Sequence, residues 1–295
     1  LQWVLHVKNY KLELDKDHCV SCQICTLACP KEAIKLEKQP KKPGEKAKKA
    51  RMDIDLAKCN FCGICDVSCP YGAIKVLANG EHTLSVVEKE SFPQLIRDIQ
   101  IDTGKYPLDR AESEDPCPLN LVTVSRLTAG GNVVENVKKL PKKKRKELGV
   151  KIDVAKEYCP CCRVCEFKLP EGVISVKKFM QGKAIIHFEK CPEGCVDCLD
   201  VCQVTGALYY SDEDKKVHVD EMYCVYCGAC KVVCPVPEAL ELKRTKIVHT
   251  AVRSGAWNKA LERLTSPVEM SKELKALGSQ KARESVEKRL GWKVT

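Results

Sequence analysis

Runs of four cysteines ending in proline recur along this chain of 295 residues. Residues 19–30 read C-V-S-C-Q-I-C-T-L-A-C-P, residues 59–70 read C-N-F-C-G-I-C-D-V-S-C-P, and residues 224–235 read C-V-Y-C-G-A-C-K-V-V-C-P. Three thiolates spaced two residues apart can hold three corners of one metal–sulfur cube, while the fourth lies a helical turn later and leads away towards a second cube. Proline then ends the short helix. The runs therefore predict cysteine ligands of 4Fe–4S clusters.

This spacing is typical of bacterial ferredoxins, in which the fourth cysteine of each run binds the cluster of the paired run. Crossing the first two runs predicts two ligand sets, which are Cys19, Cys22 and Cys25 with Cys69, and Cys59, Cys62 and Cys65 with Cys29. Residues 1–90 are thus predicted to form one ferredoxin-like domain with two clusters. We expect a hairpin within residues 1–18 and another that turns at Asn79 and Gly80.

The middle of the chain holds a degenerate copy of this arrangement. Residues 159–170 keep three cysteines, but Leu169 stands at the fourth position. Upstream, Cys117 matches the fourth cysteine of a run whose first three positions hold Pro107, Arg110 and Ser113. The crossing rule assigns all four lost cysteines to one cluster, and the remaining four to another, which is Cys159, Cys162, Cys165 and Cys117. We expect residues 91–188 to form a ferredoxin-like domain with one cluster.

A variant run begins the last cluster domain, which we expect to span residues 189–250. It reads C-P-E-G-C-V-D-C-L-D-V-C-Q, with one extra residue in the first spacer, which a small bulge would accommodate, and with Gln203 in place of proline. Paired with the complete run at 224–235, it predicts two ligand sets, which are Cys191, Cys195 and Cys198 with Cys234, and Cys224, Cys227 and Cys230 with Cys202. Residues 209–219 are expected to form a hairpin.

One of the 21 cysteines, Cys161, is left over after these five clusters are assigned. Two interpretations remain open, a buried thiol without a cluster or a replacement of Cys162 as a ligand. Cysteines this frequent would indicate disulfides in a short secreted chain, but within each run they lie too close together to bridge one another. Because clusters need reduced thiols, we expect a cytoplasmic protein.

Composition and charge narrow the class of protein further. Aromatic residues make up only 5% of the chain, and charged residues 31%, which argues against large hydrophobic cores. The net charge is +10, but five oxidised clusters with their thiolates would add about −10, which weakens a nucleic-acid interpretation. No apolar run reaches the length of a membrane span, and residues 1–12 lack the layout of a signal peptide.

Three segments lie outside the cysteine runs. The lysine-rich residues 38–51 are interpreted as a solvated insertion or as a docking patch for an acidic partner, and residues 138–147 as a solvated loop. Residues 251–295 are predicted to be helical, with a capping box at 266–269. This tail either packs on the last domain or fastens the chain to a larger complex, and Trp257 and Leu264 are its expected buried contacts.

The repeated runs resemble those of archaeal polyferredoxins, which are fused ferredoxin domains that relay electrons between redox subunits. The inserted basic loops and the segment S-G-A-W-N-K-A-L-E-R-L, at residues 254–264, look most like the polyferredoxin subunit of formylmethanofuran dehydrogenase. The resemblance implies an α+β fold of tandem ferredoxin domains with a helical C-terminal tail. It also implies a role in methanogenic or related archaea, carrying low-potential electrons to the tungsten or molybdenum site that reduces carbon dioxide.

We therefore expect an electron carrier of a larger oxidoreductase complex, with no catalytic site of its own. The histidines and tyrosines show no spacing suited to acid–base or nucleophilic catalysis, and no phosphate-binding or dinucleotide-binding glycine motif is present in the sequence. A zinc scaffold is the second hypothesis, although zinc sites favour two separated cysteine pairs. An enzyme with its own substrate pocket is the third. Within the carrier class, a hydrogenase or heterodisulfide reductase polyferredoxin is the alternative.

Overall fold

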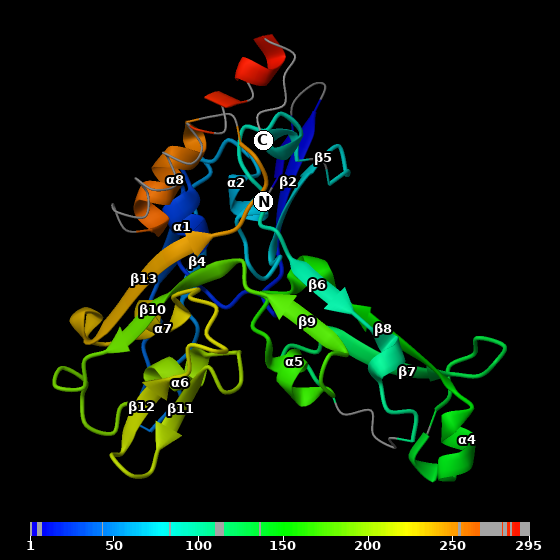
Figure 1. Cartoon of the computed structure of the whole chain (residues 1–295). Helices are drawn as coiled ribbons and strands as arrows, with labels where there is room; N and C mark the ends of the chain where they lie inside the picture. Colours follow the sequence, from blue (N-terminus) through cyan, green and yellow to red (C-terminus); the bar gives the residue numbers. More distant parts are fainter. Residues whose placement is uncertain are drawn as a thin grey trace.

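Short strands and helices are arranged in three lobes that meet near the centre of the molecule (Figure 1). The computed structural model describes residues 2–4, 8–42, 44–82, 84–109, 115–135, 137–252, 255–265, 279, 282–283 and 285–289. The first lobe is coloured blue to cyan, the second green, and the third yellow to orange (Figure 1). Small sheets and short helices with many cysteines are consistent with tandem ferredoxin domains. In the described part of the chain, no helix is long and apolar enough to cross a membrane.

The first lobe contains two antiparallel sheets, β1–β2–β5 and β3–β4. Its elements are β1 (Gln2–Val4), β2 (Asn9–Leu14), α1 (Ile24–Ala28), β3 (Ile34–Glu37), β4 (Arg51–Ile54), α2 (Ile64–Val67), β5 (Ile74–Ala78) and α3 (Ser85–Glu88). Helices α1 and α2 each carry the third cysteine of a run, and a strand follows each run. The hairpin predicted within residues 1–18 is confirmed, because β1 pairs with β2.

The second lobe repeats this plan with the sheets β6–β9 and β7–β8. Its elements are β6 (Asp98–Ile101), η1 (Thr103–Lys105), β7 (Val122–Leu127), η2 (Val137–Lys139), α4 (Lys142–Lys146), β8 (Gly149–Val154), η3 (Lys156–Tyr158), α5 (Val164–Lys168) and β9 (Ile174–Lys177). The basic stretch 138–147, predicted to be a solvated loop, includes the end of η2 and all of α4, and its lysines are exposed.

The third lobe contains the sheets β10–β13 and β11–β12. Its elements are β10 (Met180–Ile186), α6 (Asp197–Val201), β11 (Leu208–Ser211), β12 (Lys216–Val219), α7 (Ala229–Val233), η4 (Pro237–Ala239), β13 (Leu240–Ile247) and, in the tail, α8 (Ala256–Leu264). The hairpin predicted at residues 209–219 is confirmed by the pairing of β11 with β12. The β10–β13 sheet joins residues on both sides of the boundary we placed at residue 188.

A buried pair of apolar residues follows the cysteine runs and fixes each strand onto the core. The second member of the pair is Ile34, Ile74, Ile174 or Leu208, and each is at least nine-tenths buried. The residue before it is small or β-branched and also buried, as at Ala73. Side chains alternate across a strand. A buried apolar residue at its first position therefore places the apolar face of each strand towards the cysteine loops.

The hairpin predicted at Asn79 and Gly80 is wrong beyond its turn. Both residues have left-handed φ, of 54° and 86°, as a tight hairpin turn requires. Only one bridge follows, between Ala78 and Glu81, and the chain then enters the helix α3. The strand β5 pairs instead with β2, because that partner buries Leu12 against Val76.

Most described residues of the lysine-rich stretch 38–51 are exposed, as expected of a solvated insertion, but three of them contact the third lobe. Lys41 forms an ion pair with Asp197. The amide of Ala47 donates to Asp200 over 2.8 Å, and the Nζ of Lys38 donates to the carbonyl of Cys234 over 2.5 Å. Asp197 and Asp200 belong to the short helix α6, so the acidic partner of this stretch lies in the same chain.

The tail helix α8 packs against α1 of the first lobe and also contacts the last cluster domain, where Arg244 donates to the carbonyl of Leu264 and the indole N–H of Trp257 donates to His249. Trp257 and Leu264 are buried, as expected, and the ring of Trp257 meets Phe92 edge-on with centroids 5.1 Å apart. Arg263 forms a 2.8 Å ion pair with Glu32. The capping box expected at 266–269 lies outside the described residues. The described tail therefore fastens the C-terminal part of the chain to its beginning.

Candidate iron–sulfur sites

The cysteine loops share one backbone conformation, which explains why the same spacing recurs. The residue before the second cysteine is left-handed in every loop, with φ between 53° and 68°, and it is Ser21, Phe61, Cys161, Gly194 or Tyr226. Left-handed backbone is uncommon for residues other than glycine, so this conformation is imposed by the loop. In the variant run the extra residue forms a turn, and Gly194 still provides the left-handed position.

The first lobe brings together two groups of four thiols, which match the two predicted ligand sets. We call them site 1 (Cys19, Cys22, Cys25, Cys69) and site 2 (Cys29, Cys59, Cys62, Cys65). In site 1, burial raises the pKa of the Cys25 thiol, and the nearby thiols of Cys69 and Cys19 raise it further. In site 2, burial raises the pKa of Cys62, and Cys29 acts in the same direction. Each fourth cysteine thus lies beside the other run.

The second lobe brings together the four thiols that the degenerate runs retain, here called site 3 (Cys117, Cys159, Cys162, Cys165). Burial is the first cause that raises the pKa of Cys165 to about 12, and the thiols of Cys162, Cys159 and Cys117 add to it. Cys117 also acts on Cys162, whose pKa is raised to about 11, again chiefly by burial. Cys117 therefore lies with the three later cysteines despite a separation of about 40 residues in sequence.

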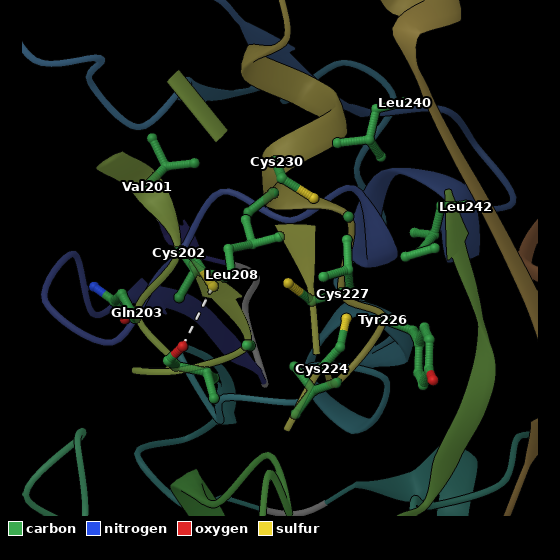
Figure 2. A pocket seen from close by; sticks show the side chains of 18 of the residues that line it. Val201, Cys202, Gln203, Leu208, Cys224, Tyr226, Cys227, Cys230, Leu240 and Leu242 are labelled. Atoms are coloured by element: carbon green, nitrogen blue, oxygen red, sulfur yellow. Dashed lines mark hydrogen bonds between the residues drawn. The ribbon is translucent and has the colours of Figure 1, made fainter. Parts of the chain in front are cut away.

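The third lobe brings together site 4 (Cys191, Cys195, Cys198, Cys234) and site 5 (Cys202, Cys224, Cys227, Cys230). Burial raises the pKa of Cys198 to about 12, with contributions from the other three thiols of site 4. Burial likewise raises the pKa of Cys202 to about 12, followed by the thiol of Cys227. Figure 2 shows the four side chains of site 5 around one space, with apolar side chains such as Leu208 and Leu242 closing it.

The described side chains fit 4Fe–4S clusters. Site 5 and site 1 each line a largely apolar cavity with all four of their cysteines, and none of the thiols is in a disulfide. Backbone amides also donate to sulfur, from Ala33 to Cys29 over 3.4 Å and from Ala73 to Cys69 over 3.3 Å. Four thiolates in an apolar pocket with N–H donors are the surroundings in which such a cluster is held and tuned.

The distances between the thiols argue against the zinc hypothesis. Among the described residues, no three histidine, cysteine or acidic side chains lie close enough to share one metal ion. A cube places a different iron at each thiolate, so it is compatible with wider spacing of the sulfurs.

The spare cysteine lies inside the site 3 loop. Cys161 is fully buried and occupies the left-handed position of that loop, which is held by Ser21, Phe61 and Tyr226 in the others. Its hydrogen bond with Cys159 lowers the pKa of Cys159. Cys162, not Cys161, is the residue whose thiol is influenced by Cys117. These observations favour the interpretation of Cys161 as a buried thiol beside the site.

Three cations near the sites, of which Arg244 is buried and Arg97 and Lys178 are partly buried, were not identifiable from the sequence. Arg97 donates to the carbonyls of Cys159 over 2.9 Å and Cys69 over 3.1 Å. Lys178 donates to the carbonyl of Cys224 over 2.8 Å, and Arg244 to that of Cys227 over 3.0 Å. Burial lowers the pKa of all three cations, whereas the nearby thiols raise it. The chain's net positive charge was the one signal of their presence.

A 4Fe–4S cluster supplies reversible one-electron chemistry. The protein side chains around these sites bind, exclude water and set the local charge. Val20, Ile24, Phe61, Ile64 and Val225, which are apolar residues interleaved in the runs, are buried, and Leu27 is partly buried. Such surroundings suit electron transfer by positioning, without any bond being made or broken.

Comparison with known proteins agrees with this chemistry. The 4Fe-4S dicluster domain family matches residues 18–73. The polyferredoxin-like subunit of an aliphatic sulfonate oxidoreductase from Pyrococcus furiosus is 32% identical over 94 residues, which are 28% of this chain and 52% of that protein. This match thus spans about half the length of the curated relative.

A solved structure resembles nearly the whole chain. It is a chain of the formate dehydrogenase–heterodisulfide reductase–formylmethanofuran dehydrogenase complex from Methanospirillum hungatei. The two chains are 28% identical and superpose with a TM-score of 0.72, over 90% of this chain and 87% of the other. The present chain therefore matches a 4Fe-4S dicluster domain at residues 18–73 and resembles, over most of its length, a chain of that complex.

Proposed function

We propose that this chain relays low-potential electrons through five 4Fe–4S clusters between redox subunits of a formylmethanofuran dehydrogenase complex. The observation that carries the proposal is the likeness, over 90% of the chain, to a subunit of a complex whose name includes that enzyme. The five groups of four cysteines of this chain, sites 1 to 5, support the same proposal. The ligands are the cysteines of sites 1 to 5, and the three lobes correspond to domains of about 1–90, 91–188 and 189–250, except that the strand β10 belongs to the third lobe.

The low potentials follow from the surroundings of the sites. The site thiols are buried or partly buried, and a bound cluster adds about −2 of charge at each site. Adding a further electron to a buried negative group is unfavourable, so the clusters become reduced only by strong donors. The cations Arg97, Lys178 and Arg244, which are buried or partly buried, offset part of this charge and raise the potentials of the nearest sites.

A polyferredoxin of a hydrogenase or heterodisulfide reductase is the alternative. The name of the similar complex includes a heterodisulfide reductase as well, and that observation supports the alternative. Both functions use the same relay and differ in the subunits that give and receive the electrons.

Anaerobic purification of the native complex distinguishes the proposed function from the alternative. The chain would carry an affinity tag in its own organism, and the copurifying proteins would be identified by mass spectrometry. We expect the tungsten- or molybdenum-containing subunits of a formylmethanofuran dehydrogenase. Recovery of hydrogenase or heterodisulfide reductase subunits without them would favour the alternative. A preparation with zinc in place of about 20 irons per chain, and no visible absorbance bleached by dithionite, would reject the relay itself.

A further inference from the structure

Sites 1 and 5 belong to different lobes, yet they share a wall. The cavity lined by the four cysteines of site 1 and the cavity lined by those of site 5 have two residues in common, Val20 and Tyr71. Both are buried, with exposed fractions of 3% and 4%. One apolar side chain and one phenol ring therefore separate the two cluster sites.

Tyr71 contacts cysteines of both sites across this wall. Its side chain lies close enough to Cys227 and Cys202 of site 5 and to Cys22 of site 1 to be influenced by all three thiols. Cys22 and Cys227 also lie near one another directly. Within the lobes, Cys25 of site 1 lies near Cys65 of site 2. Cys198 of site 4 lies near Cys230 of site 5. The four sites thus form a row in the order 2, 1, 5 and 4.

Site 3 lies beside this row, next to sites 1 and 5. Arg97 joins it to site 1, because one guanidinium donates to Cys159 of site 3 and to Cys69 and Pro70 beside site 1. Lys178 lies between Cys224 of site 5 and Cys162 of site 3. The retained site of the second lobe therefore faces the junction. In a two-cluster lobe the second site lies beyond the first, so the lost site would have been the outer one, and the buried Leu169 stands at its fourth ligand position.

We propose that Tyr71 is the junction residue of the relay and that its hydroxyl donates to the sulfur of Cys227. Its ring and Val20 place sites 1 and 5 side by side. The first and third lobes are then connected directly, and site 3 is a side branch attached through Arg97. The loss of the sixth cluster removed an outer position of that branch and left the main row continuous. This inference rests on the proposed relay function.

Transfer across the wall is a one-electron exchange between the two sites, in which no bond forms or breaks and the phenol keeps its proton. The electron comes from a low-potential donor in a partner redox subunit. A hydrogen bond to a ligand sulfur favours the reduced state of a cluster, because it stabilises the added negative charge. Tyr71 therefore raises the reduction potential of the cluster at site 5, which favours electron transfer from site 1 to site 5.

The first test compares Tyr71→Phe with the wild type and with Tyr209→Phe, each as the full chain with its clusters. Tyr209 is an exposed tyrosine of β11 in the third lobe, so its loss controls for the change of residue type. Redox titration followed by electron paramagnetic resonance should show one reduction wave moved to lower potential in Tyr71→Phe alone, with unchanged iron content. Unmoved waves in Tyr71→Phe, or equal shifts in both variants, would overturn the role of Tyr71.

A second test does not depend on Tyr71 and addresses the branch. Arg97→Gln removes a partly buried positive charge between sites 1 and 3, so two waves should move to lower potential. In a Cys117→Ala background, which lacks the cluster of site 3, the same change should move only one wave. If Arg97→Gln then moves none, Arg97 serves site 3 alone and the attachment to site 1 is wrong. A wild-type chain that binds no 4Fe–4S clusters would instead reject the proposed function, so the two failures are distinguishable.

Discussion

Cys117 and Cys161 are both buried cysteines of the second lobe, but their positions predict opposite consequences of substitution. Cys117 lies near all three cysteines of the degenerate run, whereas Cys161 occupies a loop position that serine, phenylalanine and tyrosine fill elsewhere. A thiol that binds iron cannot be replaced by a methyl group without loss of a ligand. A thiol that only fills space in the loop can be replaced without loss of a ligand.

We therefore expect Cys117→Ala to lose one cluster and Cys161→Ala to lose none. With five clusters, anaerobic iron analysis should fall from about 20 to about 16 irons per chain in Cys117→Ala. Cys161→Ala is the matched control and should remain near 20. Equal iron content in the two variants would contradict the assignment of Cys117 to site 3.

At the scale of elements, the lysine-rich stretch 38–51 and the helix α6 form a contact that holds the first and third lobes together. Its charged partners are Lys41 and Asp197, and Asp200 accepts from the backbone of the stretch at Ala47. Lys41 remains partly exposed, so salt screens this contact.

Asp197→Asn should loosen the lysine-rich stretch without changing its sequence. Trypsin should then cut within residues 41–49 a few times faster at low ionic strength, because the ion pair is lost. Asp212→Asn is the control, since Asp212 is exposed and pairs locally with Lys215. Added salt should bring the wild type towards the variant. Identical cleavage of all three proteins at low salt would show that the ion pair does not hold the stretch.

The same contact predicts a dependence on alkaline pH. The hydrogen bond with Asp197 raises the pKa of Lys41, so the contact is fully present below the ordinary lysine pKa of about 10.4 and is lost as the pH rises through the higher folded value. Cleavage of the stretch by an alkaline protease should accelerate over this range in the wild type. Asp197→Asn should show less of this acceleration, and an equal acceleration would exclude Lys41 as its cause.

The tail helix α8 gives a second element-scale prediction. Trp257 is 2% exposed and packs against Phe92 of the first lobe. Trp257→Ala should weaken the docking of α8 by about 3–5 kcal/mol, because it leaves a large cavity in the core. Proteolysis between the last cluster lobe and α8 should report the loss as faster cleavage. Glu262→Ala, on an exposed position of the same helix, should cleave like the wild type.

For the whole molecule, stability depends on the clusters as much as on apolar packing. The strands are short, aromatic residues are scarce, and many of the buried apolar positions are cysteines. Lobes this small bury little apolar area, so cluster binding and folding are coupled.

Removal of iron should therefore unfold the chain. Anaerobic chelation followed by circular dichroism and urea titration should show loss of the cooperative transition, with no stable folded form at neutral pH. The same treatment without chelator provides the control. An iron-free chain that still unfolds cooperatively would show that apolar packing alone maintains the three lobes.

Much of the candidate site was predictable, because a cluster ligand set is encoded by local spacing and by one pairing rule. Two signals were sufficient to group the cysteines into five sets. One is the spacing within the complete runs, with two, two and three residues between successive cysteines, and the other is the complementary loss of cysteines around Leu169 and Cys117. The structure places the members of each set together. The hairpin at Asn79 and Gly80 was predicted wrongly beyond its turn, because β2 offered β5 a better apolar partner.

By itself, the sequence determined the chemistry of this protein, the candidate ligands and the repeated strand–loop–helix plan, since each depends on residues a few positions apart. The tertiary structure alone decided which sites are neighbours, where α8 docks and what the lysine-rich stretch contacts. Those contacts join surfaces far apart in the chain. The sequence does not distinguish a lysine that stays in solvent from Lys41, which pairs with Asp197. It also does not distinguish a tyrosine that only fills the core from Tyr71, which separates two cluster sites.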